Sequence, residues 1–203
     1  MTARALSIVA VALALTACSG APTTGDGGTD AGKPNPCANK PNYVFDASFN
    51  LEACGAYVGV EGSAESDAAR AAQFITPLAG VKLPVSKPYK FSWSTASFPN
   101  APMPEGGADS DAGGGAGLSG VAYVVYFVDA NTSKELLRVH TTATEWTPDD
   151  AAWGKLTAAA KMPNPPGLQL KIAAALFSNG AIASGTVPVI APQPRLVYLD
   201  PMM

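Results

Sequence analysis

Apolar and polar residues alternate along much of the second half of the chain, as they do in β-strands. In residues 168–176 (LQLKIAAAL) an apolar residue returns at every second position, which directs those side chains to one face of a sheet. Residues 89–94 (YKFSWS) alternate in the same way. Residues 121–128 (VAYVVYFV) form an unbroken aromatic and β-branched run, typical of a strand covered on both faces. These patterns predict three strands.

Shorter apolar stretches between turn residues predict further strands. They are expected at residues 43–45, 56–60, 135–141, 142–147 and about 181–190. Asn179-Gly180 is a hairpin turn signal and precedes the last of these strands. Several short strands with turn residues between them predict a β-sandwich.

Two short segments carry helix signals. Residues 149–161 are rich in helix formers, Thr147 or Asp149 can cap their start, and Pro163 ends the pattern. Residues 63–74 are a second candidate helix, and the alternative is an extended lead-in to the next strand.

Composition favours the same fold class. The 203 residues include 20 Gly and 18 Pro, and only 14% of them are charged, which favours a secreted β-protein over a helical bundle. The net charge of −3 provides no basic surface for nucleic acid, so we expect no nucleic-acid partner.

The predicted sandwich domain spans residues 74–203. Over about residues 74–190 of it, the segments ITPLAGVKLPVSKPYKFSWS, AYVVYFVD, TEWTP and LQLKIAAALFSNGAIASGTVPV resemble a fibronectin type III or similar immunoglobulin-like domain. Domains of this kind open with a proline-flanked strand and place a Trp, here Trp93, on the second strand facing the core. Their third strand has an aromatic-x-aliphatic-x-aromatic pattern, matched at residues 123–127. The sixth strand departs by lacking the Tyr that the family often carries. The resemblance implies an all-β, fibronectin-type-III-like β-sandwich, with the helix at 149–161 as an addition.

The first residues have the layout of a secretory signal. Arg4 precedes the apolar run 5–14, which is too short to span a bilayer as a helix. The run ends in Leu15-Thr16-Ala17-Cys18, which resembles the lipobox of bacterial lipoproteins. The resemblance implies a signal peptide at 1–17, removed after Cys18 receives lipid, and a membrane anchor. The alternatives are an ordinary secretory signal with a chance Cys and a cytoplasmic protein with an apolar helix. Ser19 resembles the sorting residue of outer-membrane lipoproteins of Gram-negative bacteria.

A flexible tether and a disulfide-closed segment are expected between the signal and the sandwich. Residues 18–36 contain no aromatic and no branched aliphatic residue, so they cannot bury enough apolar surface to order themselves. With Cys18 used for lipid, Cys37 and Cys54 remain as one possible pair in an oxidising compartment. We therefore predict a structural disulfide that closes a small segment, 37–73.

A long insertion interrupts the predicted sandwich near residues 98–120. Its abundance of glycine and lack of aromatic residues after Phe98 favour disorder over a ligand-binding loop.

The candidate chemistry is sparse. His140 is the only histidine, and we expect it to be exposed or at the rim, without a catalytic role. Four acidic residues are of the type that glycosidases use, but their spacing singles out no pair; they are Glu135, Glu145, Asp149 and Asp150. The sequence predicts no enzyme, no cofactor and no metal site.

Trp146 and Trp153 are candidate ligand-facing aromatics for a sugar platform, and the alternative is that they pack in the core. Our expectation is a cell-envelope lipoprotein that presents a β-sandwich as a spacer or protein-interaction module. Its partners would be the membrane, through the lipid, and a cell-envelope protein or polysaccharide. A carbohydrate- or cell-wall-binding module is the alternative function, and a hydrolase is a more distant one.

Overall fold

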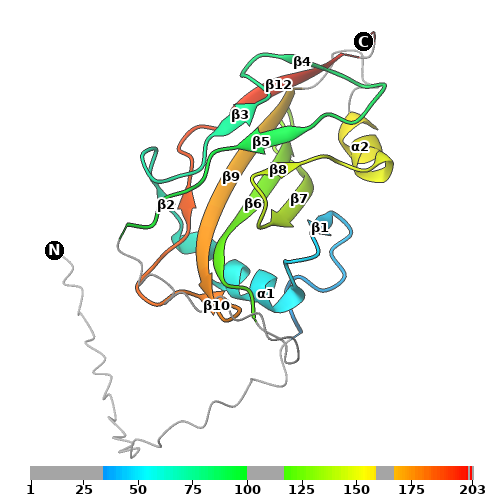
Figure 1. Cartoon of the computed structure of the whole chain (residues 1–203). Coiled ribbons are helices and arrows are strands. Elements are labelled where there is room, and N and C mark those ends of the chain that lie inside the picture. Colours follow the sequence, from blue (N-terminus) through cyan, green and yellow to red (C-terminus); the bar gives the residue numbers. More distant parts are fainter. Residues whose placement is uncertain (1–33, 100–116, 159–166, 201, 203) are drawn as a thin grey trace, which may run out of the picture. The chain divides into compact units, whose positions relative to one another are not determined.

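A computed structural model describes residues 34–99, 117–158, 167–200 and 202 of the chain (Figure 1). The fold is mostly β, with two short helices and two sheets. Its elements are β1 (Tyr43–Phe45), α1 (Leu51–Val60), the 3-10 turn η1 (Glu61–Ser63), β2 (Glu65–Ser66), β3 (Phe74–Thr76), β4 (Lys82–Pro84), β5 (Phe91–Trp93), β6 (Gly120–Asp129), β7 (Glu135–Thr141), β8 (Glu145–Trp146), α2 (Asp150–Thr157), β9 (Gly167–Ser178), β10 (Ala181–Ile182), β11 (Val189–Ile190) and β12 (Arg195–Asp200).

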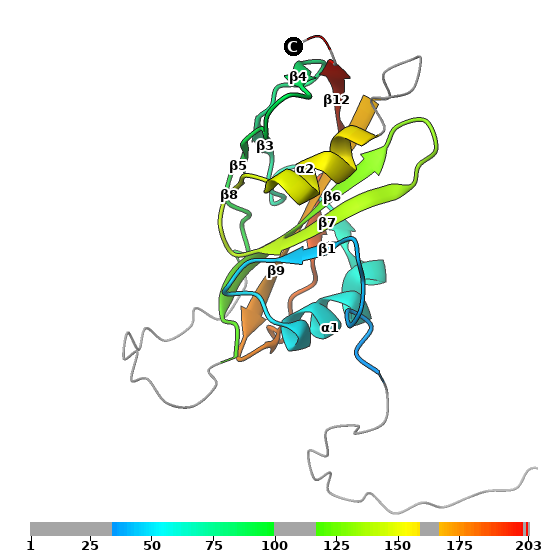
Figure 2. The same ribbon diagram turned by 90° about the vertical axis from the view of Figure 1, so that its right-hand side faces the viewer.

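The larger sheet has nine strands in the described residues and is built around the long antiparallel pair β6–β9. Its central order is β1-β7-β6-β9-β11-β2; β10 and β12 also pair with β9, and β4 pairs with β12. Three of its pairings are parallel: β1 with β7, β2 with β11 and β4 with β12. The smaller sheet has the order β3-β5-β8 and lies over one face of the larger one (Figures 1 and 2).

The main core lies between the two sheets. Tyr123, Val125 and Phe127 of β6 face the smaller sheet, where they meet Phe91 and Trp93 of β5. The intervening residues of β6 point to the opposite face, where α1 packs. This two-sided burial is what the apolar run at 121–128 predicts, and Trp93 is in the core, only 2% exposed.

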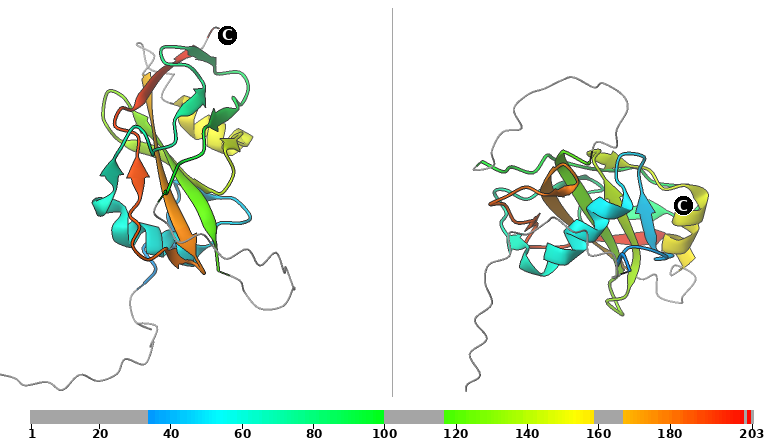
Figure 3. Two further views of the ribbon diagram at one scale, coloured as in Figure 1. Left: turned by 60° about the vertical axis from the view of Figure 1, so that its left-hand side comes forward. Right: turned by 90° about the horizontal axis from the view of Figure 1, so that it is seen from below.

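Helix α1 covers part of the second face of the larger sheet (Figure 3). Asn50 caps it by accepting a hydrogen bond from the Ala53 amide, and Tyr57 packs against the sheet. The Cys37–Cys54 disulfide is present, as predicted, and lies in this core with both cysteines at most 1% exposed. The segment before the helix also joins the sheet, because β1 pairs with β7.

Residues 56–60 are therefore helical, and the strand predicted there is wrong. The segment is apolar enough for either state, and its fit under the sheet, together with the Asn50 cap, overrides a weak β preference.

The helix predicted at 63–74 is also wrong. The chain instead makes η1, the short strand β2 and then a turn, in which the Asp67 carboxylate accepts hydrogen bonds from the amides of Ala69 and Arg70. That local bonding offers the backbone an alternative to a helix.

The last predicted strand, 181–190, is interrupted. β10 and β11 occupy its ends, and between them the chain turns out of the sheet, with Gly185 at φ +73° and the Thr186 amide bonded to the Ala183 carbonyl. The prediction missed β12, which continues the same edge along β9. The strand expected at 142–147 is reduced to the two residues of β8.

Two local predictions are confirmed. Asp149 caps α2 by accepting a hydrogen bond from the Ala152 amide at 2.7 Å. Asn179 and Gly180 form the tight turn between β9 and β10, with φ of +51° and +81°, the left-handed values that this hairpin requires.

The predicted signal peptide, Cys18 and residues 19–33 of the tether lie outside the described residues, as do residues 100–116 of the insertion. At the edges of the insertion, Phe98 packs against the main core and Gly120 begins β6. Among the described residues, no helix combines the length and apolar character needed to cross a bilayer.

Replacing both cysteines, Cys37→Ala with Cys54→Ala, should lower the free energy of unfolding by about 3 kcal/mol, because the unfolded chain regains the entropy of a closed loop of this length. Urea unfolding followed by circular dichroism, in a Cys18→Ser background, measures the change. A loss below about 1 kcal/mol would contradict a stabilising role.

Candidate functional site

Beyond the C-terminal end of α1, the second face of the larger sheet is open and carries polar side chains. They form two rows across β7, β6 and β9, since Arg138, Tyr126 and Lys171 are cross-strand neighbours, and Glu135, Val128 and Gln169 are as well. A pocket of about 380 Å³ lies over these rows. Its lining residues are Tyr57, Glu61, Ala64, Tyr126, Val128, Ser133, Glu135, Arg138, Gln169, Lys171 and Ile190.

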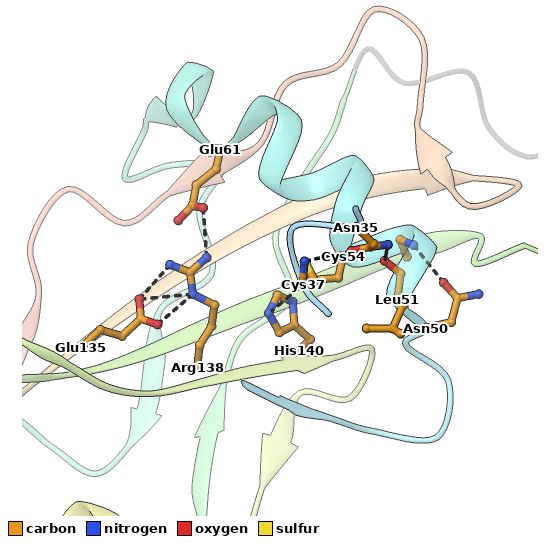
Figure 4. Close-up of a disulfide and its surroundings, with 10 residues drawn as sticks. Asn35, Cys37, Asn50, Leu51, Cys54, Glu61, Glu135, Arg138 and His140 are labelled. Carbon is orange, nitrogen blue, oxygen red and sulfur yellow. Dashed lines mark hydrogen bonds and ion pairs between the residues drawn. A yellow bond between two sulfur atoms is a disulfide. The ribbon is translucent and has the colours of Figure 1, made fainter. Parts of the chain in front are cut away.

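Arg138 lines this pocket and lies between Glu61 and Glu135 (Figure 4). Its guanidinium pairs with Glu61 at 3.0 Å and with Glu135 at 2.7 Å. The guanidinium carbon also lies 4.8 Å from the ring centre of Tyr43 and 4.6 Å from that of Tyr126, distances at which cation–π attraction operates. Burial works to lower the pKa of Arg138, but the hydrogen bond and charge of Glu135 and the charge of Glu61 outweigh it, so the pKa rises.

A chain of hydrogen bonds connects α1 to this guanidinium. The hydroxyls of Tyr57 and Tyr126 are 2.8 Å apart, and that of Tyr126 donates to Glu61 at 2.8 Å. Burial raises the pKa of both tyrosines, so their hydroxyls stay protonated donors. Because the Tyr126 hydroxyl donates its hydrogen bond to Glu61, the Tyr57 hydroxyl must donate to the Tyr126 oxygen. The network thus fixes Glu61 in place.

Three further side chains of the pocket have no hydrogen-bond or ion-pair partner among the described residues. Lys171 and Ser133 are exposed and Gln169 is half-buried. The pocket therefore combines a rigid, fully paired part around Arg138 with free donors and acceptors on its floor and rim.

His140 lies two residues along β7 from Arg138, on the same face, and it is completely buried. Its ring stacks on Phe45, with centroids 4.9 Å apart, and packs against Phe49 at 5.0 Å. Its Nε2 lies 3.7 Å from Cys54 Sγ, while Nδ1 has no partner in the described part of the chain (Figure 4). Burial, and secondarily the charge of Arg138, lowers its pKa to about 3. The imidazole is thus neutral and shielded from solvent.

The expectation of an exposed or rim histidine is therefore wrong. The alternation of β7 predicts that residues 138 and 140 share one face of the sheet. It does not predict whether another element covers that face at either position.

The two tryptophans proposed for a sugar platform lie on the opposite side of the larger sheet. Trp153 is 4% exposed and donates its indole N–H to the Val85 carbonyl at 3.1 Å, so it is not available to a ligand. Trp146 is half-buried and stacks on Phe91, with centroids 6.1 Å apart.

Of the four acidic candidates, the structure brings only Glu135 into the pocket. Asp149 caps α2, Asp150 stands in its first turn, and Glu145 pairs with Lys90 at the surface. Sequence reasoning missed Glu61, Arg138, Gln169 and Lys171. The alternation of β7 and β9 placed three of them on one face, but Glu61 follows a helix that was not predicted. Among the described residues, no group of three His, Cys, Asp or Glu side chains is placed to hold a metal ion.

Replacing Arg138 with Met should destabilise the fold by about 2 kcal/mol, because Glu61 and Glu135 lose the charge that compensates their partial burial. Thermal and urea unfolding measure the loss. The control, Arg70→Met, removes an arginine from surface ion pairs with Glu65 and Asp67 and should change stability far less. Equal losses in the two variants would contradict the central role of Arg138.

The depressed pKa of His140 makes stability fall with acid. Below about pH 6.5 His140 binds a proton in the unfolded state, whereas in the folded state it binds one only near pH 3. Between these values the free energy of unfolding therefore falls by about 1.4 kcal/mol for each pH unit of acidification. Urea midpoints between about pH 6.5 and 5.5, above the usual pKa values of Asp and Glu near 4, measure this slope. In His140→Leu the slope should largely vanish; an unchanged slope would show that other groups cause it.

Comparison of the chain with protein-family models, with curated proteins and with solved structures gives no match in any of the three. Its function must therefore be argued from its own residues.

Proposed function

We propose that this chain is a lipoprotein of the bacterial cell envelope, in which a lipid on Cys18 anchors a non-catalytic β-sandwich that binds an envelope component. The observation that carries the binding role is the pocket beside Arg138, whose floor and rim hold side chains without partners in the described structure. A domain that served only as a spacer would have no need of a pocket with a preorganised ion-pair network.

The anchor rests on the sequence. Leu15-Thr16-Ala17-Cys18 stands at the end of an apolar run that is too short to span a bilayer. Two or more acyl chains on Cys18 would give stable anchoring, whereas one alone is marginal. Ser19 favours the outer membrane of a Gram-negative bacterium as the destination.

We also propose an immunoglobulin-like topology of the fibronectin type III kind for the sandwich. The smaller sheet, β3-β5-β8, has the order of strands A, B and E of that fold. In the larger sheet, β7, β6 and β9 have the order of strands C′, C and F. The short strands β10, β11 and β12, which all pair with β9, together take the place of strand G. The long insertion then falls between strands B and C, and α2 between E and F.

Several contacts favour binding over catalysis. His140, the single histidine, is buried against a disulfide and aromatic rings, where it can neither reach a substrate nor activate a hydroxyl. Glu61 and Glu135 both pair with one guanidinium, so they form a single ionic unit and not a separate acid and nucleophile.

Binding of carbohydrate or cell wall is a second candidate function. The mixed acidic, basic, amide and hydroxyl lining of the pocket favours it.

The anchor is tested by Cys18→Ser. The variant should take up no labelled fatty acid in growing cells and should not be cut by the lipoprotein signal peptidase. Ser19→Ala is the matched control and should still be labelled. Unchanged labelling and cleavage of Cys18→Ser would contradict the proposed attachment.

A further inference from the structure

We infer that the pocket beside Arg138 binds a neutral saccharide. The inference rests on the proposed function as a binding module and names its ligand class and the residues that hold it.

The pocket has a flat floor and one polar wall. The floor is the part of the β7, β6 and β9 face beyond α1, where the row of Val128 and Gln169 lies beside the row of Tyr126 and Lys171. Lys171 is exposed and Gln169 half-buried, whereas Val128 and Tyr126 are each only 7% exposed. Ile190 of β11 extends this floor. The wall is the end of α1 and η1, from which Glu61 reaches Arg138. Ile190, which is half-buried, and the small exposed part of Val128 supply the apolar surface on which the C–H face of a sugar ring can pack.

Charge in the pocket is balanced. Arg138 and Lys171 carry two positive charges, and Glu61 and Glu135 carry two negative ones. An anionic ligand would meet two carboxylates, and a cationic ligand would meet Lys171 and Arg138. The four charges sum to zero, so the pocket as a whole offers neither an anion nor a cation a net attraction, and a neutral polar ligand needs none.

Hydrogen-bonding capacity matches a polyhydroxylated ligand. Lys171 offers donors, and Gln169 and Ser133 offer both donors and acceptors, all without partners in the described structure. The carboxylates of Glu61 and Glu135 retain lone pairs beyond those used by Arg138. Sugar hydroxyls donate and accept at once, so one ring can satisfy both kinds of group.

The polar wall is ordered before any ligand arrives. Tyr57, Tyr126 and Glu61 form a continuous hydrogen-bonded chain to Arg138, and the rings of Tyr43 and Tyr126 clamp that guanidinium. The wall therefore loses little conformational entropy on binding, and the entropic cost on the protein side falls on Lys171 and Gln169. The pocket, about 380 Å³, falls at the lower end of the range for small-molecule sites, which suits a short saccharide or one unit of a longer chain.

The experiment is an NMR titration of the full-length chain carrying Cys18→Ser, labelled with ¹⁵N. The probes are N,N′-diacetylchitobiose, cellobiose and maltose, with sodium acetate and guanidinium chloride as matched ionic probes at equal ionic strength. At least one saccharide should shift the amide signals of Val128, Gln169, Lys171 and Ile190, and neither ion should do so.

Matched variants assign the effect to side chains. Lys171→Ala and Gln169→Ala should each weaken the binding about fivefold, since each removes one hydrogen bond to the ligand. The controls are Lys87→Ala and Gln193→Ala, which remove the same side chains from exposed positions outside the pocket and should leave binding unchanged. Unfolding midpoints of all four variants separate loss of binding from loss of fold.

Three results would overturn the inference: no shift with any of the three saccharides, shifts centred on Trp146 and not on the pocket, or equal responses to saccharide and to either ion. Each is distinguishable from failure of the proposed anchor, because fatty-acid labelling at Cys18 is measured separately.

Discussion

The pairing of β6 with β9 is the interaction on which the rest of the structure depends. The two strands run antiparallel from Gly120 opposite Phe177 to Asp129 opposite Leu168, and both bury apolar side chains on their two faces. Each face of this strand pair carries several large apolar side chains, and exposing them to water would cost free energy. The fold is accordingly a central sheet with a cover on each side, the smaller sheet with α2 on one and α1 with the disulfide on the other.

The two covers differ in extent, and that difference creates the site. A helix of ten residues is about 15 Å long, whereas the twelve residues of β9 extend about 40 Å. Helix α1 therefore covers only part of its face. Along β9 the side chains change accordingly, from Ala173, Ala175 and Phe177 beneath the helix to Lys171 and Gln169 beyond it. The pocket is the part of the sheet that the helix leaves open.

Arg138 holds the boundary between the covered and open parts. Its position on β7 is close to the end of α1, so one guanidinium can pair with Glu61 from the helix side and Glu135 from its own strand. A partly buried arginine is tolerable here because all three guanidinium nitrogens donate to Glu61 or Glu135, and two tyrosine rings lie within cation–π distance of it. The same contacts that stabilise it also fix the polar wall on which the proposed saccharide site depends.

Local pattern alone determined the central strands, the Asn179-Gly180 turn, the capped helix α2 and the pairing of Cys37 with Cys54. Each of these is decided by neighbours in sequence, by period, by turn chemistry or by the number of cysteines available. The identity of α1, the continuation of the edge into β12, the burial of His140 and the pairing of Glu61 with Arg138 were decided only by the tertiary structure. The reason is physical: alternation states which side chains share a face of a strand, but not which element covers that face, or how far along it the cover extends.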